Sequence, residues 1–435
     1  MTSPKRPTIS IKSAITAASA EPPDHPDIES RYAWLRLAAA ILIGTIGGVG
    51  MWSVAVALPA VQAEFGVTRG AASLPYTMTM LGLAAGGILY GRLADKRGIA
   101  SPLTLGAVFL CAGYLAGSLA QDMWQFVAVQ GVLIGGLGGA STFGPLVADI
   151  SLWFRRRRGI AVALVASGNY VAGAVWPPLL TWAIEAYGWR RTYAGIGVFC
   201  LVSILPLVLL MRRTAPPQPA PTLADVATSR GNGGRPLGFN PNALQALLMV
   251  AGIACCVGMS MPQVHLVAYC GDLGYGVKRG AEMLSLMFIG GVISRLASGY
   301  LSDRVGGLYA LALGSTLQAL MLTLFLPFDG LGALYVISAL FGLAQGGIVP
   351  SYAIIVRELY PASEAGTRVS AVLMSTVAGM ALGGWLSGII YDLSGGYQAA
   401  FLNGIAWNVF NVAIALELIR RSVGGNRRQT REVTA

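Results

Sequence analysis

The sequence predicts an all-α polytopic membrane protein, in which twelve transmembrane helices form two pseudo-symmetric six-helix bundles. Three observations predict this fold. The 435-residue chain is 55% hydrophobic and only 11% charged, whereas soluble domains carry about 25% charged residues. Apolar runs long enough to cross a bilayer recur along the whole chain. A polar motif that ends one of these runs is repeated in the second half of the chain.

The apolar runs predict helices, because only helices and closed barrels span lipid and these runs are too long and continuous for barrel strands. Glycine is abundant, with 57 residues, which suits close packing of membrane helices. We expect the twelve spans at about residues 34–60, 71–91, 101–120, 124–149, 159–183, 192–211, 243–270, 280–302, 308–327, 331–356, 367–391 and 398–419.

A polar segment rich in proline and glycine, residues 212–242, separates the sixth run from the seventh. We expect it to be a cytoplasmic linker between an N-terminal bundle, 33–211, and a C-terminal bundle, 243–420. Residues 1–32 are rich in Pro, Ser, Thr and charge, and the first 30 hold no apolar core. We therefore expect a disordered cytoplasmic tail rather than a cleaved signal peptide. A second cytoplasmic tail is expected at 421–435.

The distribution of positive charge predicts the orientation. If the N-terminus is cytoplasmic, most of the 30 lysines and arginines fall in cytoplasmic segments, including the run Arg155-Arg156-Arg157-Arg158. The positive-inside rule then places both termini in the cytoplasm. We expect an integral protein of the lipid bilayer of the cell membrane, which in a bacterium is the inner membrane. The net charge of +11 belongs to these loops and does not indicate a nucleic-acid partner.

The repeated motif indicates that the two bundles are homologous. Gly91-Arg92-Leu93-Ala94-Asp95-Lys96-Arg97-Gly98 follows the second run, and Gly299-Tyr300-Leu301-Ser302-Asp303-Arg304-Val305-Gly306 follows the eighth. The same separation along the chain relates Gly138-Gly139 to Gly346-Gly347. Two similar bundles joined by a linker are typical of secondary transporters, which bind their substrate near mid-membrane between the halves.

Arg295 is the main candidate for a binding residue, because it lies inside the eighth apolar run. A charge at mid-membrane costs at least about 2.5–3.5 kcal/mol and usually marks a functional site. Nearly all acidic residues lie at span ends or in loops, and Asp149 and Glu282 reach furthest inward. Arg295 therefore lacks an evident counter-ion, which predicts a small organic anion as the substrate. The alternatives are a structural ion pair and a snorkelling side chain.

Further polar and aromatic residues near the middle of the spans are candidates for the same site. His265 can donate, accept or titrate near neutral pH. It would serve as a second substrate ligand or proton carrier, or else as a hydrogen-bonded packing residue. The other candidates for substrate binding are Tyr76, Trp52, Asn169, Tyr170, Gln263 and Ser375.

The two motif copies resemble the hallmark loops of the major facilitator superfamily, which lie between helices 2 and 3 and, in weaker form, between helices 8 and 9. The resemblance covers about residues 34–420. It implies a twelve-helix fold, transport by alternating access, and a cavity lined by spans 1, 2, 4, 5, 7, 8, 10 and 11.

Four shorter segments resemble the bacterial monocarboxylate-transporter branch, which is similar to oxalate exchangers and to carriers of lactate- and pyruvate-like acids. They are LPAVQAEFG at 58–66, WFRRRRGIA at 153–161, GWRR at 188–191 and HLVAY at 265–269. This resemblance implies that Arg295 binds the substrate carboxylate. Two positions depart from it. Gly291 stands where proton-coupled relatives have Asp, and the eleventh span lacks the interior lysine of oxalate exchangers.

The charged residues of the two motif copies are predicted to act in conformational change. A carboxylate at a cytoplasmic helix junction can cap a neighbouring helix or pair with arginine, which favours the outward-facing state. The alternative is a solvated loop charge. The residues concerned are Asp95, Arg92, Arg97, Asp303 and Arg304.

The sequence shows no catalytic constellation, phosphate-binding loop or metal-ligand spacing, so we expect no enzyme activity, no cofactor and no metal site. The predicted function is secondary transport of a small organic anion, a monocarboxylate, by a monomer. A drug or hydrophobic-compound efflux carrier of the same fold is one alternative, and a membrane receptor that does not transport is another. The identity of the acid, the direction, and the choice among proton symport, exchange and uniport stay open.

Overall fold

The computed structural model describes residues 26–215, 236–360 and 362–433, and every regular element in these ranges is helical. Twelve described segments are long and apolar enough to span a membrane, which confirms the predicted fold class. The elements are α2 (Arg31–Gly47), α3 (Val49–Phe65), α4 (Arg69–Arg97), α5 (Ala100–Ser118), α6 (Met123–Ala128), η1 (Val129–Gly138), η2 (Gly139–Thr142), α7 (Gly144–Ile150), α8 (Arg158–Tyr187), α9 (Trp189–Leu210), η3 (Pro236–Gly238), α11 (Pro241–Asp272), α12 (Val277–Val305), α13 (Gly307–Leu324), α14 (Leu331–Gln345), α15 (Ile348–Leu359), α16 (Ala362–Ser394) and α17 (Gln398–Val433).

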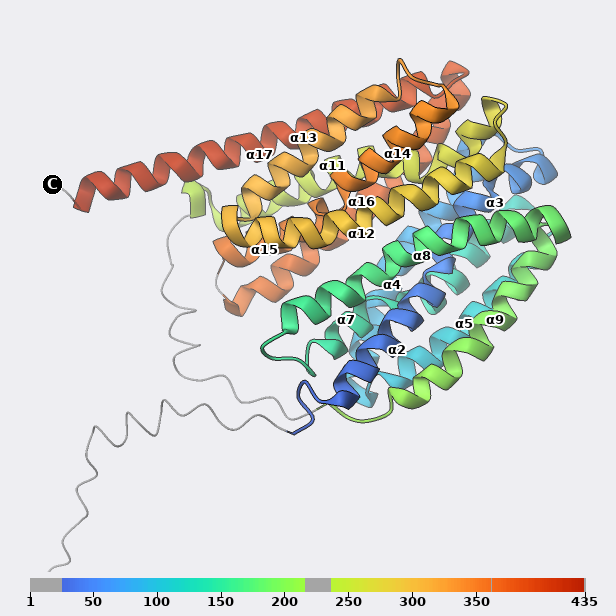
Figure 1. The fold of residues 1–435 in the computed structure, drawn as a ribbon, viewed down its shortest axis with the longest axis horizontal. Coiled ribbons are helices and arrows are strands. Elements are labelled where there is room, and N and C mark those ends of the chain that lie inside the picture. Colours follow the sequence, from blue (N-terminus) through green and yellow to red (C-terminus); the bar gives the residue numbers. More distant parts are fainter. Residues whose placement is uncertain (1–25, 216–235, 361, 434–435) are drawn as a thin grey trace, which may run out of the picture.

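The helices form two elongated groups that lie side by side (Figure 1). The elements α2 to α9 make the N-terminal half, and η3 to α17 make the C-terminal half. The start of α2 and the end of α17 lie at the same end of the molecule, on the left in Figure 1. We call this the tail end and the opposite one the far end. Most of the expected N-terminal tail and linker lies outside the described residues, and α17 continues to Val433.

Three of the twelve spans are interrupted helices. The first passes from α2 into α3 at Gly48, and the tenth passes from α14 into α15 at Gly346-Gly347. The fourth contains a π-helical stretch, η1, and a short 3₁₀ turn, η2. Glycines on both helices let α4 and η1 approach closely. A methyl group at Gly86 of α4 would overlap the Gly136 carbonyl, and one at Gly135 of η1 would lie 2.6 Å from the Thr79 carbonyl oxygen. The glycine run therefore serves helix packing.

The two halves meet along two pairs of helices. In one pair α8 packs along α12, and in the other α4 packs along α16. Thr77 of α4 donates a hydrogen bond to the Ala381 carbonyl of α16 at 2.9 Å, and Ser285 of α12 donates one to the Ala174 carbonyl of α8. We call the α8–α12 contact line the seam.

The contacts between the halves are concentrated toward the far end. Where both partners are described, the hydrogen bonds between the halves run from Arg69 at the far end to the Arg295–Ala166 contact in the seam. At the tail end of α4, glycines 87 and 91 have no atom of another element within 4 Å of an added Cβ. The described structure is therefore closed at the far end.

Candidate functional site

Arg295 lies in the seam, between the two halves of the molecule. It is half-buried on α12, seven residues before the end of the apolar span at Ser302, or roughly 10 Å at about 1.5 Å per residue. Its Nη1 donates to the Ala166 carbonyl of α8 at 2.7 Å. Its Nε donates to the Gly346 carbonyl at 3.4 Å, which is a long bond. One guanidinium thus contacts both halves.

No carboxylate in the described part of the chain forms an ion pair with Arg295. The two acids that reach furthest into the spans are paired elsewhere. Asp149 binds Arg36 at 2.7 Å, and Glu282 binds Arg279 at 3.0 Å. The two carbonyls accept from Nη1 and Nε, so the guanidinium retains further N–H donors.

The ring of Tyr170 supports the Arg295 guanidinium. The Arg295 Cζ lies 4.2 Å from the centre of that ring, a cation–π contact between α12 and α8. Tyr170 is buried and packs against Gly291, one turn before Arg295. A methyl group at Gly291 would overlap the ring, so this small residue provides the space that Tyr170 fills.

An aromatic cluster of Trp52, Tyr170 and Phe288 lies on the side of Arg295 that faces the far end. The ring centres of Trp52 and Phe288 lie 4.1 Å apart, and those of Tyr170 and Phe288 lie 5.5 Å apart. Trp52 and Tyr170 were sequence candidates, but Phe288 was not, because a phenylalanine in an apolar run looks the same whether it faces lipid or the interior. The ring of Phe288 presses on Gly173, where a methyl group would lie 2.5 Å from Phe288 Cδ2.

Asn169 joins this cluster through the main chain and through its amide. The indole N–H of Trp52 donates to the Asn169 carbonyl at 3.1 Å, and the Asn169 amide nitrogen lies 3.5 Å from the Met51 sulfur. Its side chain is half-buried. The structure therefore brings together four of the predicted site residues, namely Arg295, Tyr170, Trp52 and Asn169.

The other sequence candidates make no hydrogen bond or ring contact with Arg295 in the described structure, and each is held in contacts within or between helices. His265 is buried, with Nε2 donating to the Gly384 carbonyl at 2.8 Å and Nδ1 lying 3.1 Å from the Tyr397 hydroxyl. Gln263 donates to Gln345 at 2.9 Å. Ser375 donates to the Val372 carbonyl of its own helix, and Tyr76 packs against Gly384. In this conformation both nitrogens of His265 are engaged.

Comparison with known proteins decides the family. The sequence profile of the Major Facilitator Superfamily matches residues 40–328 and again residues 248–434. The chain belongs to the Major Facilitator Superfamily. It is a membrane transporter of this family, which confirms the family membership that the sequence motifs predicted. The double match agrees with the duplicated motifs of the two halves.

Named members of the superfamily include monocarboxylate transporters. Monocarboxylate transporter 13 of Bos taurus is 30% identical over 317 residues, which is 71% of this chain and 71% of that protein. Monocarboxylate transporter 11 of Homo sapiens is 25% identical over 408 residues, or 90% of this chain and 83% of that protein. The peptide transporter POT in complex with sulfate has the same fold, with a TM-score of 0.69, 14% identity and coverage of 89% and 95%.

The first superfamily motif is solvated in this conformation. Asp95, Arg92 and Arg97 are exposed at the tail end of α4, and among the described residues no hydrogen bond or ion pair is made by Asp95.

In the second copy of the motif, Arg304 is exposed and lies over the Tyr300 ring at 4.4 Å. The side chain of Asp303 lies outside what the structure describes.

A carboxylate that the sequence analysis did not single out caps a helix at the second copy of the motif. The backbone N–H of Gly307, at the start of α13, donates to the two oxygens of Glu358 at 3.1 and 3.3 Å. A carboxylate at a helix N-terminus is favourable for both hydrogen bonding and charge. Glu358 lies beyond the motif in the sequence, so only the fold reveals this capping role.

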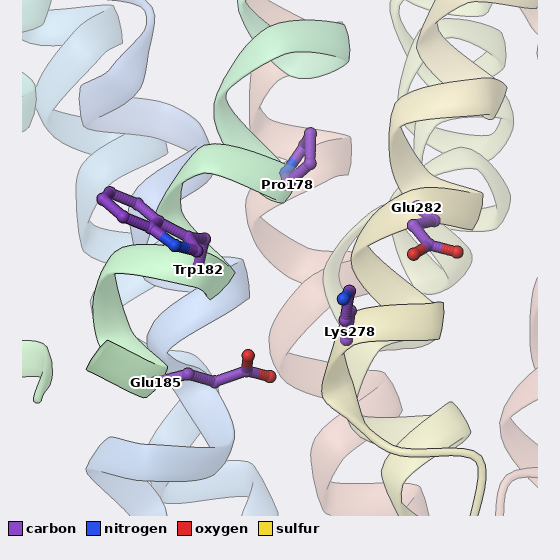
Figure 2. Close-up of a pocket in the computed structure, with 5 residues that line it drawn as sticks. All are labelled: Pro178, Trp182, Glu185, Lys278 and Glu282. Carbon is purple, nitrogen blue, oxygen red and sulfur yellow. The ribbon is translucent and has the colours of Figure 1, made fainter.

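A small pocket of about 70 Å³ opens near the far end of the seam, away from Arg295. It lies between Pro178, Trp182 and Glu185 of α8 and Lys278 and Glu282 of α12 (Figure 2). Figure 2 shows Glu185 pointing from α8 toward α12. With two carboxylates and one lysine, its lining does not suit an anion. Throughout the described ranges, this pocket included, no group of three or more His, Cys, Asp and Glu residues is placed to hold a metal ion.

Proposed function

We propose that this transporter moves a small organic anion, a monocarboxylate, across the cytoplasmic membrane by alternating access, and that Arg295 binds the carboxylate. The observation that carries the proposal is the state of Arg295. It lies between the two halves, and the described structure gives it carbonyls and a ring as partners but no carboxylate. An anionic substrate would provide the missing counter-charge.

The shape of the site supports a carboxylate with an apolar body. A guanidinium is planar and matches the two oxygens of a carboxylate, to which it can donate in a bidentate manner. The aromatic cluster next to it is apolar, and its rings are packed against one another in this conformation. The relatives named monocarboxylate transporters support a single carboxylate over other anions.

The contact between Arg295 and Ala166 suggests how binding is linked to movement. This hydrogen bond crosses the seam. A carboxylate that replaces the Ala166 carbonyl as the partner of Arg295 would therefore remove one contact between the halves. A ligand shifts a conformational equilibrium by its difference in affinity for the two states. We propose that the substrate lowers the cost of separating α8 from α12 at this level.

We also infer that the tail end faces the cytoplasm. Arginines 155, 156 and 157 lie at the tail end next to the start of α8, as the positive-inside rule requires of a cytoplasmic surface. With this orientation, the end of the transporter that is closed in this structure faces the outside of the cell. A fluorescent protein fused to the C-terminus should fold and fluoresce in cells, whereas a periplasmic alkaline phosphatase fused there should be inactive.

Uptake by proteoliposomes tests the proposal. Radiolabelled acids, amines and a hydrophobic dye are offered to wild type, Arg295→Gln, Arg295→Lys and the control Arg279→Gln, which removes an exposed arginine from the same helix. Hydrogen bonds to charged groups contribute about 1.5–3 kcal/mol each. We therefore expect Arg295→Gln to raise the KM for an acid by about ten- to a hundredfold, and the control to match wild type.

The same assay separates the competing functions. Uptake of amines or dyes but not of acids would favour an efflux carrier, and saturable binding without flux would favour a receptor. Acid uptake that Arg295→Gln leaves unchanged would remove Arg295 from the site. An imposed proton gradient and an acid preloaded inside the vesicles then distinguish proton symport, uniport and exchange.

A further inference from the structure

Arg69 joins the two halves at the far end. It is the first residue of α4, in the N-terminal half, and its side chain is only 7% exposed. Its Nη2 donates to both oxygens of Asp272, at the end of α11 in the C-terminal half, at 2.9 and 3.0 Å. The guanidinium also lies over the rings of Tyr391 and Tyr397, at 4.9 and 5.9 Å.

A second carboxylate from the C-terminal half holds the start of the same helix. The oxygens of Asp392 accept from the backbone N–H groups of Arg69 and Gly70 at 2.8 and 2.7 Å. The first N–H groups of a helix have no partner within the helix, and a negative charge there is favourable. Asp392 supplies both the acceptors and the charge. One helix start is therefore bound by two acidic residues of the opposite half.

The helices behind these charges are in close contact. A methyl group at Gly388 would lie 2.9 Å from the Arg69 carbonyl and 2.7 Å from the Ser73 hydroxyl oxygen. Burial raises the pKa of Tyr397 above its ordinary value of 10.0, so its hydroxyl stays protonated and can donate to Nδ1 of His265. His265 in turn donates to Gly384 of α16. Hydrogen bonds thus extend inward from the Arg69 cluster.

The cluster is also next to open space. A pocket of about 410 Å³ at the far end is lined by residues of both halves, among them Gln62, Arg69, Gly271 and Asp272. The side chain of Asp272 is 35% exposed, and the buried Nε of Arg69 has no hydrogen-bond partner in the described structure. Water in this pocket can hydrate the separated charges, so the cluster is able to dissociate without stranding a charge in an apolar interior.

We propose that Arg69, Asp272 and Asp392 form a latch that closes the far end of the transporter and separates once in each transport cycle. Alternating access, which belongs to the proposed function, requires that α4 and α16 part at the far end when the site opens there. The hydrogen bonds that Asp272 and Asp392 accept from Arg69 and Gly70 all cross between the two halves, so they are lost in that movement. The aromatic cluster is the inner layer of the same closure, and the latch is the outer layer.

Thiol accessibility tests the latch without a substrate. Ser73 is buried on α4 one turn inside Arg69, so a cysteine there reacts with a hydrophilic maleimide only when the far end opens. The variant Ser73→Cys is made in a background without the five native cysteines, all of which are buried. We expect slow labelling in the parent and at least fivefold faster labelling when Arg69→Gln or Asp392→Asn is added. Arg279→Gln, an exposed far-end change, is the matched control.

A double-mutant comparison tests whether Arg69 and Asp272 act as a pair. If they do, Arg69→Gln combined with Asp272→Asn should label no faster than Arg69→Gln alone, because the second change removes nothing more. Labelling rates that multiply would show that the two residues act separately and would overturn the pairing.

The experiment distinguishes failure of the latch proposal from two other outcomes. These are unfolding of a variant and failure of the proposed transport function. In a parallel sample, Cys200, which is buried within the N-terminal half, is the only cysteine, and its labelling reports unfolding. A latch variant in which Cys200 becomes labelled is replaced by the milder substitution Asp272→Asn. Labelling of folded variants at the parental rate overturns the latch, whatever the acid screen shows. If the latch variants label faster at position 73 but wild type takes up no acid, the latch proposal stands and the proposed anion transport is rejected.

Discussion

Gly291 lies directly against the ring of Tyr170, and the two residues come from opposite halves of the transporter. The contact leaves no space for even a methyl group at position 291. Tyr170 in turn lies 4.2 Å from the Arg295 guanidinium. The position of the proposed anion-binding arginine thus depends on a glycine one turn away on its own helix and on a ring from the facing helix.

The variant Gly291→Ala should displace the Tyr170 ring and weaken carboxylate binding. We expect the KM for the transported acid to rise several-fold while the protein still folds, because the overlap is with a side chain that can shift. Gly299→Ala is the matched control on the same helix, since an added methyl group there meets no atom within 4 Å. The KM of each alanine variant is obtained from uptake kinetics in proteoliposomes. Equal KM values for the two alanine variants would show that the Gly291–Tyr170 contact does not position Arg295.

Replacement of Tyr170 separates the ring from its hydroxyl group. Tyr170→Phe keeps the aromatic face below Arg295, so its KM should stay within about twofold of wild type. Tyr170→Leu removes the cation–π contact, which is worth about 0.5–2 kcal/mol, and should raise KM by about two- to thirtyfold with little change in maximal rate. If the phenylalanine and leucine variants behave alike, the ring does not support the guanidinium.

The sequence predicted the helical fold and made Arg295 a candidate for a binding residue, since both depend on signals that stand out along the chain. A charge within an apolar run is unusual, and apolar runs of about 20 residues are typical of membrane-spanning helices. Phe288 and Gly291 carry no such signal, because apolar residues and glycine are common in every span. Their role depends on which helix faces which, and that arrangement follows only from the packed bundle.

The latch residues were missed for a related reason. Arg69, Asp272 and Asp392 each lie at the end of an apolar run, where charge is ordinary, and they are far apart in the sequence. The repeat shows that the halves correspond but does not show which loops touch across the interface. His265 was identified as unusual, yet a buried histidine with two partners and one that binds a ligand look alike in a sequence.

His265 provides a direct test of its predicted role as a substrate ligand or proton carrier. His265→Ala leaves the Gly384 carbonyl and the Tyr397 hydroxyl without partners, and each unpaired buried group costs about 1–3 kcal/mol. We therefore expect a lower thermal unfolding midpoint, together with a KM and a pH profile of uptake that match wild type once the protein is folded. A shifted pH profile or a raised KM in the stable fraction would instead support the predicted ligand or proton-carrier role.

The pair of Arg36 and Asp149 makes its contacts within the N-terminal half of the molecule. Arg36 is 1% exposed, and its Nε and Nη2 donate to the two Asp149 oxygens at 2.8 and 2.7 Å. Its Nη1 donates to the Arg213 carbonyl at 3.1 Å, and its Cζ lies 4.5 Å from the centre of the Trp153 ring. The pair therefore joins α2, α7 and the segment after α9, all within one half.

Single and double substitutions of this pair should differ sharply. Arg36→Met alone or Asp149→Leu alone leaves a buried charge unpaired, which costs about 3–5 kcal/mol, so we expect a clear fall in the unfolding midpoint measured in detergent. Replacing both with apolar residues of similar size can be close to neutral. The double variant should thus recover most of the lost stability. It should also transport the acid with a KM near that of wild type, because the contacts of both residues lie within one half. A double variant that is stable but does not transport would mean that this half also changes shape during the cycle, and that Arg36 takes part in the change.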